Sequence, residues 1–330
     1  MKGHRAPTGI DMDDFIKECF KAIKKERYGI VKPGDAQAED SDTSAYDELM
    51  SMTGLDEVKR AIKRELAYHK VMEQRRKAGR SVPRRLMHML LTGNPGTGKT
   101  TCARLVGRIY RQAGLLSIGH LIETSRAGLV GQYIGQSEKV VSEKIEAARG
   151  GILFIDEIYS LVENSGPAHE SRDFGHRVLD TLMPVLSDPR ADIMVIGAGY
   201  TTEMKRFIKA NPGLASRFPL VLNFRDFTLD ELMEIARDLL AKYEFHLTSE
   251  AEAKLTDLLT VAGRLENCGN ARLVTTLIEN YIIPNCCERL DRLAAEELTD
   301  EALSTIIAAD IPSLAEIAPL QSPTRPRLGY

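Results

Sequence analysis

Short apolar runs alternate with helical stripes along the middle of the chain. The runs are Leu86–Leu91, His120–Ile122, Gly151–Ile155, Ile193–Ile196 and Leu220–Leu222. Strands that alternate with helices in this way are typical of a parallel sheet covered on both faces. The pattern therefore predicts an α/β domain with a parallel five-stranded sheet over residues 46–225.

The flanking segments have different patterns. Residues 226–311 show helical spacing only, which predicts a small all-helical second domain. Residues 1–45 combine a short amphipathic helix at 11–28 with a polar linker, and the proline-rich residues 312–330 are typical of an irregular, disordered tail. A long amphipathic helix is expected from about Leu55 to Lys77.

Composition excludes several classes of protein. The 330 residues are enough for two domains, and 43% hydrophobic with 28% charged residues is ordinary for a globular chain. A net charge of −3 gives no overall attraction to nucleic acid, and no apolar run is long enough to cross a bilayer. The five cysteines lack metal-ligand or disulfide spacing and the start of the chain lacks an apolar leader, so we expect a cytoplasmic protein.

A glycine-rich segment, Gly93–Thr100, lies between the first apolar run and a helical stripe. It fits the pattern G-x-x-x-x-G-K-[ST], in which backbone N–H groups and a helix N-terminus face a phosphate chain. We expect Lys99 to reach the β- and γ-phosphates of ATP and Thr100 to bind Mg²⁺. The expected nucleotide-binding residues here are Asn94, Pro95, Gly96, Thr97, Gly98, Lys99, Thr100 and Thr101. The alternative is an ordinary glycine-rich turn between a strand and a helix.

Two acids follow the apolar run Gly151–Ile155. Downstream of a phosphate-binding loop, this pattern predicts that Asp156 binds Mg²⁺ and that Glu157 is the general base for the attacking water. Alone, the pair would be read as a solvated strand end. Together with the loop, it predicts ATP hydrolysis with Lys99 and Glu157 as catalytic residues.

Several motifs resemble those of AAA+ ATPases, in particular the branch of red-type Rubisco activases and stage V sporulation K-like proteins. They are the phosphate-binding loop, Phe154–Leu161, Leu129–Gly135, Asn211–Phe218 and Gly269–Arg272, and the resemblance covers about Thr53 to Leu290. It implies an AAA+ core with the P-loop strand at the centre of the sheet, a helical lid over 226–311, ATP between the two, and a ring, expected to be a hexamer.

The resemblance also implies roles for individual residues. Arg217 matches the arginine finger that a subunit supplies to its neighbour's nucleotide, and Arg272 matches the sensor-2 arginine of the lid. Read without the family, each is an ordinary structural arginine. Gly54 and Leu55 resemble a segment that packs against adenine. Tyr200 follows the strand where many family members carry a sensor asparagine, so its role stays open.

The segment Tyr133-Ile134-Gly135 is similar to the aromatic pore loop that grips polypeptide in such rings. Without the family, the tyrosine and isoleucine would be read as packed against a helix. These features favour an ATP-driven remodeller of a protein partner, with Rubisco activation as one possibility. A nucleic-acid motor is the first alternative, but this loop carries no basic residues. A regulatory ATP switch is the second alternative.

Overall fold

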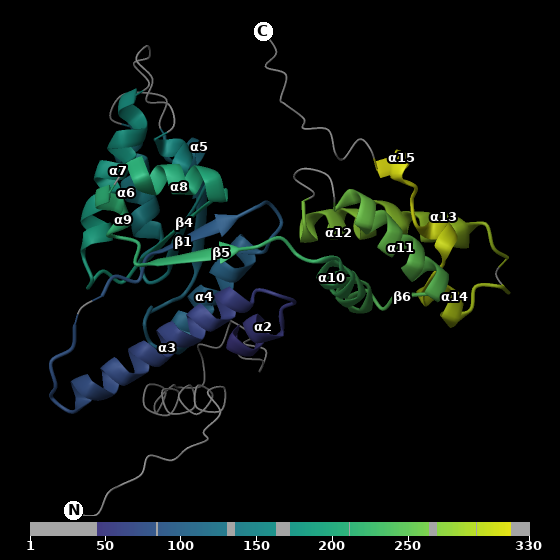
Figure 1. The fold of residues 1–330 in the computed structure, drawn as a ribbon, viewed down its shortest axis with the longest axis horizontal. Helices are drawn as coiled ribbons and strands as arrows, with labels where there is room; N and C mark the ends of the chain where they lie inside the picture. The colour runs from purple at the N-terminus through teal and green to yellow at the C-terminus, as the bar shows by residue number, and fades with distance from the viewer. Residues whose placement is uncertain are drawn as a thin grey trace, which may run out of the picture. The chain divides into compact units, whose positions relative to one another are not determined.

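The computed structural model describes residues 45–83, 85–130, 136–162, 172–210, 212–263, 269–294 and 296–317 (Figure 1). The chain divides into two compact units. The first consists of Met1–Thr92 and Lys99–Phe224, and the second joins Gly93–Gly98 to Arg225–Tyr330. The predicted 11–28 helix and most of the predicted linker lie outside the described residues.

The first unit holds a five-stranded sheet in the order β2-β3-β4-β1-β5. Its strands are β1 Met89–Gly93, β2 Leu121–Ser125, β3 Ile152–Asp156, β4 Met194–Gly199 and β5 Leu220–Phe224. The pairs β2–β3, β3–β4 and β4–β1 are parallel, with Met89 opposite Ile196 and Ile152 opposite Met194. All five predicted strands are confirmed. The P-loop strand β1 is an interior strand, but the middle of the sheet is β4, so its predicted central place is wrong by one strand.

Helices cover both faces of this sheet (Figure 1). They are α2 Ala45–Ser51, α3 Asp56–Lys77, α4 Lys99–Gln112, α5 Arg126–Leu129, α6 Gln136–Ala147, η1 Ile158–Leu161, α7 Arg172–Ser187, α8 Thr201–Ala210 and α9 Pro212–Ala215. The long helix predicted from Leu55 is α3. The sequence pattern missed α2, which begins at Ala45 and buries Tyr46 and Leu49.

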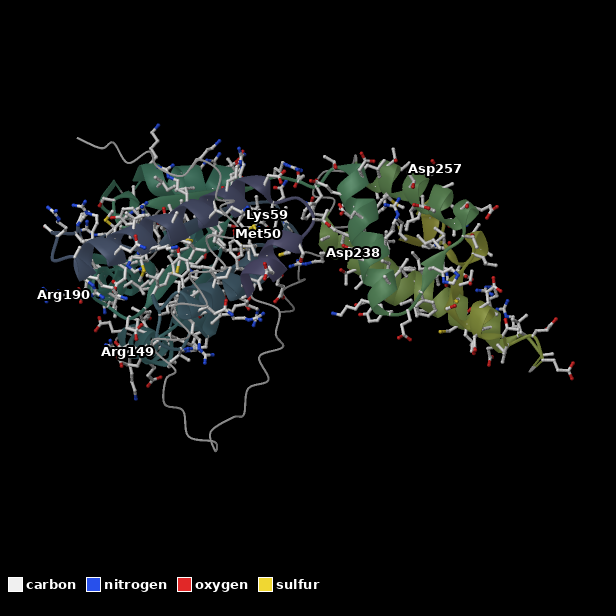
Figure 2. The ribbon with its side chains drawn as sticks, turned by 90° about the horizontal axis from the view of Figure 1, so that it is seen from below. Met50, Lys59, Arg149, Arg190, Asp238 and Asp257 are labelled. Carbon is white, nitrogen blue, oxygen red and sulfur yellow. The ribbon has the colours of Figure 1, made fainter. Side chains whose placement is uncertain are left out.

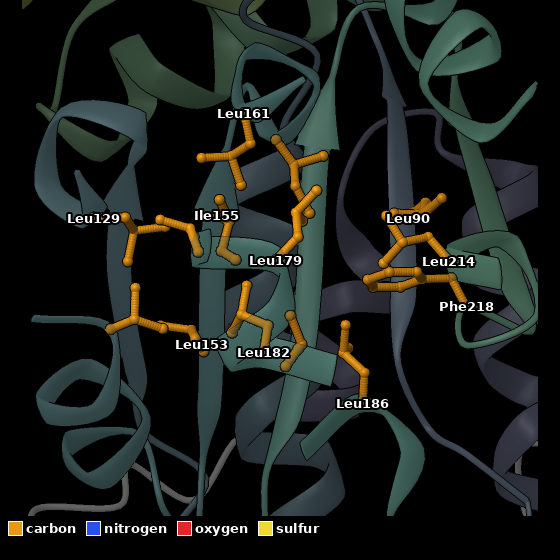
Figure 3. Close-up of a cluster of buried hydrophobic side chains, with 14 of the residues drawn as sticks. Leu90, Leu129, Leu153, Ile155, Leu161, Leu179, Leu182, Leu186, Leu214 and Phe218 are labelled. Carbon is orange, nitrogen blue, oxygen red and sulfur yellow. The ribbon is translucent and has the colours of Figure 1, made fainter. Parts of the chain in front are cut away.

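The core follows from the two-residue period of the strands. Leu90, Leu153 and Ile155 point to one face of the sheet, where they pack with α6, α7 and α8 in one buried cluster (Figure 3). Their neighbours in sequence, such as Leu91 and Phe154, are equally buried. They point to the opposite face, where Figure 1 shows α3 and α4. Both faces are therefore covered, as expected for a parallel sheet.

The second unit contains the lid helices. Its elements are α10 Leu229–Lys242, β6 His246–Leu247, α11 Ser249–Ala262, α12 Ala271–Leu277, η2 Ile278–Ile282, α13 Ile283–Asp291, α14 Asp300–Ser304, β7 Thr305–Ile306, η3 Ala308–Asp310 and α15 Leu314–Ile317. The predicted helical lid is confirmed, apart from the two-residue parallel pair β6–β7. Each unit carries exposed charged side chains, among them Arg149 and Arg190 of the first and Asp238 and Asp257 of the second (Figure 2).

The predicted irregular tail begins too early. Residues 314–317 form α15, and Ile317 is fully buried in the lid core together with Ile311. Pro312 lies between these two buried residues, and its presence is why composition alone indicated disorder there. The ordered lid therefore extends to Ile317, and residues 318–330 lie outside the described part of the chain.

Candidate nucleotide site

The glycine-rich loop has the backbone geometry that its sequence predicts. Gly93, Gly96 and Gly98 all have positive φ, at 152°, 72° and 90°, a region that favours glycine. The Thr97 hydroxyl is fully buried and donates to the Asn94 carbonyl at 2.8 Å, which closes the loop internally. The chain then enters the 14-residue helix α4 at Lys99, so the loop precedes a helix N-terminus as a phosphate site requires.

Asp156 and Glu157 lie at the carboxyl end of β3. Asp156 is the last strand residue, and Glu157 adopts a left-handed conformation with φ 48° and ψ 45°. The Glu157 N–H donates to Asp156 Oδ1 at 3.0 Å. A non-glycine residue in this region costs roughly 1–3 kcal/mol and is held only where the surroundings impose it. Glu157 is exposed, so its carboxylate can meet a ligand.

The turn after Glu157 is held against β4. A Cβ on Gly197 would lie 2.8 Å from Ile158 Cδ1, and one on Gly199 would lie 2.6 Å from Tyr159 Cδ1, so a side chain at either position would displace these neighbours. The rings of Tyr159 and Tyr200 lie 6.1 Å apart at an angle of 40°. Tyr200 thus contacts the turn that carries Glu157, a link through Tyr159 that sequence reasoning missed.

The residues predicted to hold Mg²⁺ supply a suitable donor set. Asp156 offers a carboxylate at the end of β3, and Thr100 offers a hydroxyl in the first turn of α4. Mg²⁺ is usually held by one or two such oxygens together with substrate phosphates and water. Within the described ranges, no group of three or more His, Cys, Asp or Glu residues could hold a metal ion by itself. The Asp156 carboxylate and the Thr100 hydroxyl are oxygens of the kind that Mg²⁺ binds together with phosphates and water, so they fit this ion.

Arg217 is held by hydroxyl groups. Its Nε donates to Ser187 Oγ at 2.9 Å and its Nη1 to Ser216 Oγ at 3.0 Å. Among the residues that the structure describes, no carboxylate pairs with Arg217. The described residues therefore do not show the alternative reading, in which a surface arginine neutralises a neighbouring acid.

Arg217 also lies far from Glu157 of the same chain. Phe218, the next residue, packs its ring 6.1 Å from His88, which precedes β1 at the amino edge of the sheet. Glu157 lies at the opposite, carboxyl edge, and Figure 3 shows Leu161 and Leu186 at opposite ends of the core between these edges. A six-residue strand such as β4 spans about 17 Å, more than one arginine side chain reaches.

The remaining predicted residues fall in different places. Gly54 and Leu55 both have positive φ, 64° and 60°, and the buried Leu55 is the N-cap of α3. Leu55 and Glu157 are thus two of four described non-glycine residues with positive φ. Arg272 is exposed in the first turn of α12. Tyr133, Ile134 and Gly135 lie outside the described residues.

The sequence matches known proteins over most of its length. Residues 89–226 match the ATPase family associated with various cellular activities, and residues 228–321 match the AAA lid domain. The chain is 39% identical over 267 residues to stage V sporulation protein K of Bacillus subtilis, which covers 80% of each sequence.

The chain is an AAA ATPase. This enzyme is also 37% identical to the chloroplastic ribulose bisphosphate carboxylase/oxygenase activase of Cyanidioschyzon merolae, over 79% of this chain and 87% of the relative. The AAA domain of FIGL-1 in complex with ADP has the same fold, with a TM-score of 0.52, 21% identity and coverage of 96% and 94% of the two chains. In the described part of this AAA ATPase, every helix is too short or too polar to cross a membrane.

Proposed function

We propose that this AAA ATPase is a ring motor that uses ATP to remodel a protein partner. The observation that carries the proposal is the placement of two functional groups at opposite edges of one sheet. Glu157 is held in a strained turn at the carboxyl edge, whereas Arg217 is held by hydroxyls at the amino edge. A subunit built this way has a base for its own nucleotide and an arginine for another subunit's nucleotide.

Each predicted site residue has its own role in the proposed hydrolysis. The loop Gly93–Gly98 and Lys99 bind and orient the phosphates, while Thr100 and Asp156 would hold Mg²⁺, which would supply positive charge beside the phosphates when bound. The Glu157 carboxylate accepts a proton from the water that attacks the γ-phosphorus. The Tyr159–Tyr200 ring contact keeps the turn of Glu157 in place. Arg272, on the lid, contacts the phosphates as the sensor-2 arginine, and Gly54 and Leu55 pack against adenine.

The ring follows from the position of Arg217. An arginine that serves the next subunit makes a head-to-tail contact between different surfaces, and such contacts close into rings when the rotation fits. We propose a hexamer, which is the ring size that the resemblance to AAA+ ATPases implies. The guanidinium of Arg217 then stabilises the charge of the transition state across each subunit boundary.

The partner is proposed to be a protein, engaged by the loop around Tyr133. One named relative supports this, because it is an activase of another protein, the enzyme ribulose bisphosphate carboxylase/oxygenase. The pair Tyr133-Ile134 is apolar and uncharged, which suits contact with many peptide sequences and gives no attraction to phosphates. The cytoplasmic location remains a prediction from the cysteine content.

Substrate trapping tests this proposal. Glu157→Gln should bind ATP without hydrolysing it and should retain its partner, which is then identified by pull-down and mass spectrometry. The matched control, Glu157→Gln with Lys99→Ala, should retain nothing because it cannot bind ATP. Tyr133→Ala should keep basal ATPase activity and lose remodelling of the captured protein. Enrichment of DNA or RNA, or unchanged remodelling by Tyr133→Ala, would contradict the proposal.

A further inference from the structure

The side chain of Asn270 joins three segments of the second unit. Its Nδ2 donates to the Pro95 carbonyl at 3.2 Å and to Asp226 Oδ1 at 2.8 Å, and its Oδ1 accepts the Phe227 N–H at 3.0 Å. Asn94 Nδ2 donates to the same Asp226 carboxylate, at 3.0 and 2.9 Å. One amide thus connects the glycine-rich loop, the start of the lid and the turn before α12.

Asn270 is buried, and its backbone conformation is unusual for a residue other than glycine. Only 2% of it is exposed, and its backbone has φ 49° and ψ −132°, which strongly favours glycine. A buried amide in a strained backbone is stable only when its hydrogen bonds are made, because an unpaired buried amide is costly. The strain and the complete bonding therefore indicate that the Asn270 contacts hold this turn in shape.

The glycine-rich loop and the turn before α12 approach each other so closely that a side chain at position 96 would not fit between them. A Cβ on Gly96 would lie 1.9 Å from the Gly269 carbonyl oxygen and 3.0 Å from the Arg272 nitrogen. The Ala271 N–H donates to the Gly96 carbonyl at 3.1 Å. The carbonyls of Pro95 and Gly96, which are neighbours in the loop, are therefore both bound by the lid.

Binding these two carbonyls fixes two N–H groups. In a trans peptide the C=O and the following N–H point in opposite directions. A Pro95 carbonyl held on the lid side therefore turns the Gly96 N–H away from the lid, and the Gly96 carbonyl does the same for the Thr97 N–H. These N–H groups belong to the loop that is expected to face phosphates.

We propose that Asn270 is a positioning residue that sets the phosphate-binding form of the P-loop from the lid. The inference rests on the proposed function, in which this loop binds ATP. Since coupling between two sites is reciprocal, nucleotide in the loop stabilises the lid turn by the same factor. Loss of the amide lowers nucleotide affinity about ten-fold, the effect of one or two hydrogen bonds.

The test variant is Asn270→Gly, which removes the amide and accepts the positive φ. Its affinity for ADP and ATP is measured by calorimetry on the full chain, and hydrogen exchange of residues 271–291 is followed with and without ADP. Asn285→Ala is the matched control, because Asn285 also donates one hydrogen bond inside the lid, to the Asp310 carbonyl at 3.0 Å. We expect weaker binding and loss of ADP-dependent protection in Asn270→Gly, with normal affinity in Asn285→Ala.

A second variant separates positioning from folding. Asp226→Asn combined with Asn270→Asp restores a hydrogen bond between the two side chains but leaves the Pro95 carbonyl without its donor. We expect normal exchange of the lid without nucleotide, but weak binding. Wild-type affinity in Asn270→Gly, or equal loss in Asn285→Ala, would overturn the inference. Wild-type affinity in Lys99→Ala would instead refute the proposed nucleotide site, so the two failures are distinguishable.

Discussion

Replacement of Arg217 by alanine should abolish hydrolysis but leave ATP binding intact. The guanidinium bonds only to the hydroxyls of Ser187 and Ser216 among the described residues, so its loss leaves no buried carboxylate unpaired and the fold should persist. Arginine fingers contribute roughly 10³–10⁵-fold to turnover where they act. At saturating protein concentration, Arg217→Ala should therefore bind ATP normally and hydrolyse it at least about a thousand-fold more slowly.

Mixing two inactive variants shows where this arginine acts. An Arg217→Ala subunit keeps its base, and a Glu157→Gln subunit keeps its arginine. In a one-to-one mixture, half of the subunits keep the base and half of their neighbours supply the arginine. Random assembly should therefore restore about a quarter of wild-type ATPase activity.

We expect this recovery of ATPase activity because Glu157 and Arg217 lie at opposite edges of the sheet of one subunit, so the two residues of one site come from two subunits. Arg217→Lys is the control for charge alone, and it should stay slow because an ammonium lacks the planar fork of the guanidinium. Co-assembly is verified by affinity-tagging one variant and detecting the untagged variant in the pull-down. Near-normal turnover of Arg217→Ala alone, or no recovery in rings shown to be mixed, would refute the assignment of Arg217 to a neighbouring site.

Three further predictions follow from contacts in the two units. Gly199→Ala would place a Cβ 2.6 Å from Tyr159, so kcat should fall while the affinity for ATP, measured by calorimetry, is kept. Arg289→Ala leaves Asp310, which is 1% exposed, without its ion pair and should lower the free energy of unfolding in urea by about 3–5 kcal/mol. Burial lowers the pKa of His88 to about 4. As the pH falls, the His88 imidazole is therefore protonated in the unfolded chain before it is protonated in the folded chain. The free energy of unfolding should fall by up to about 3 kcal/mol as pH drops from about 6.5 to 4, and His88→Gln should reduce this pH dependence.

Local patterns in the sequence predicted much of the fold and part of the candidate site. The two-residue and helical periods predicted the five strands and the long helices, and motif spacing indicated the glycine-rich loop, Asp156 and Glu157. The missed features depend on contacts between distant segments. The Tyr159–Tyr200 ring contact and the Asn270 bonds to Pro95 and Asp226 join residues 41 to 175 positions apart, and no local pattern marks them.

Composition also misled at one place. Pro312 and the prolines after it indicated disorder from 312 onward, yet a single apolar residue, Ile317, anchors another helical turn in the lid core. The small strands β6 and β7 were missed for a similar reason, because two residues are too few to show a period of two. The backbone strain at Leu55, Glu157 and Asn270 became visible only in the structure.

Single-turnover hydrolysis by Glu157→Gln tests the central claim most directly. Equal concentrations of wild-type and variant protein are loaded with radiolabelled ATP and Mg²⁺, and the release of phosphate is followed after rapid mixing. The amide keeps the size of the carboxylate but cannot accept the proton of water, and a general base contributes roughly 10²–10⁴-fold to rate. We predict unchanged ATP binding and a rate of phosphate formation lower by that factor. Phosphate formation at the wild-type rate would contradict the assignment of Glu157 as the base.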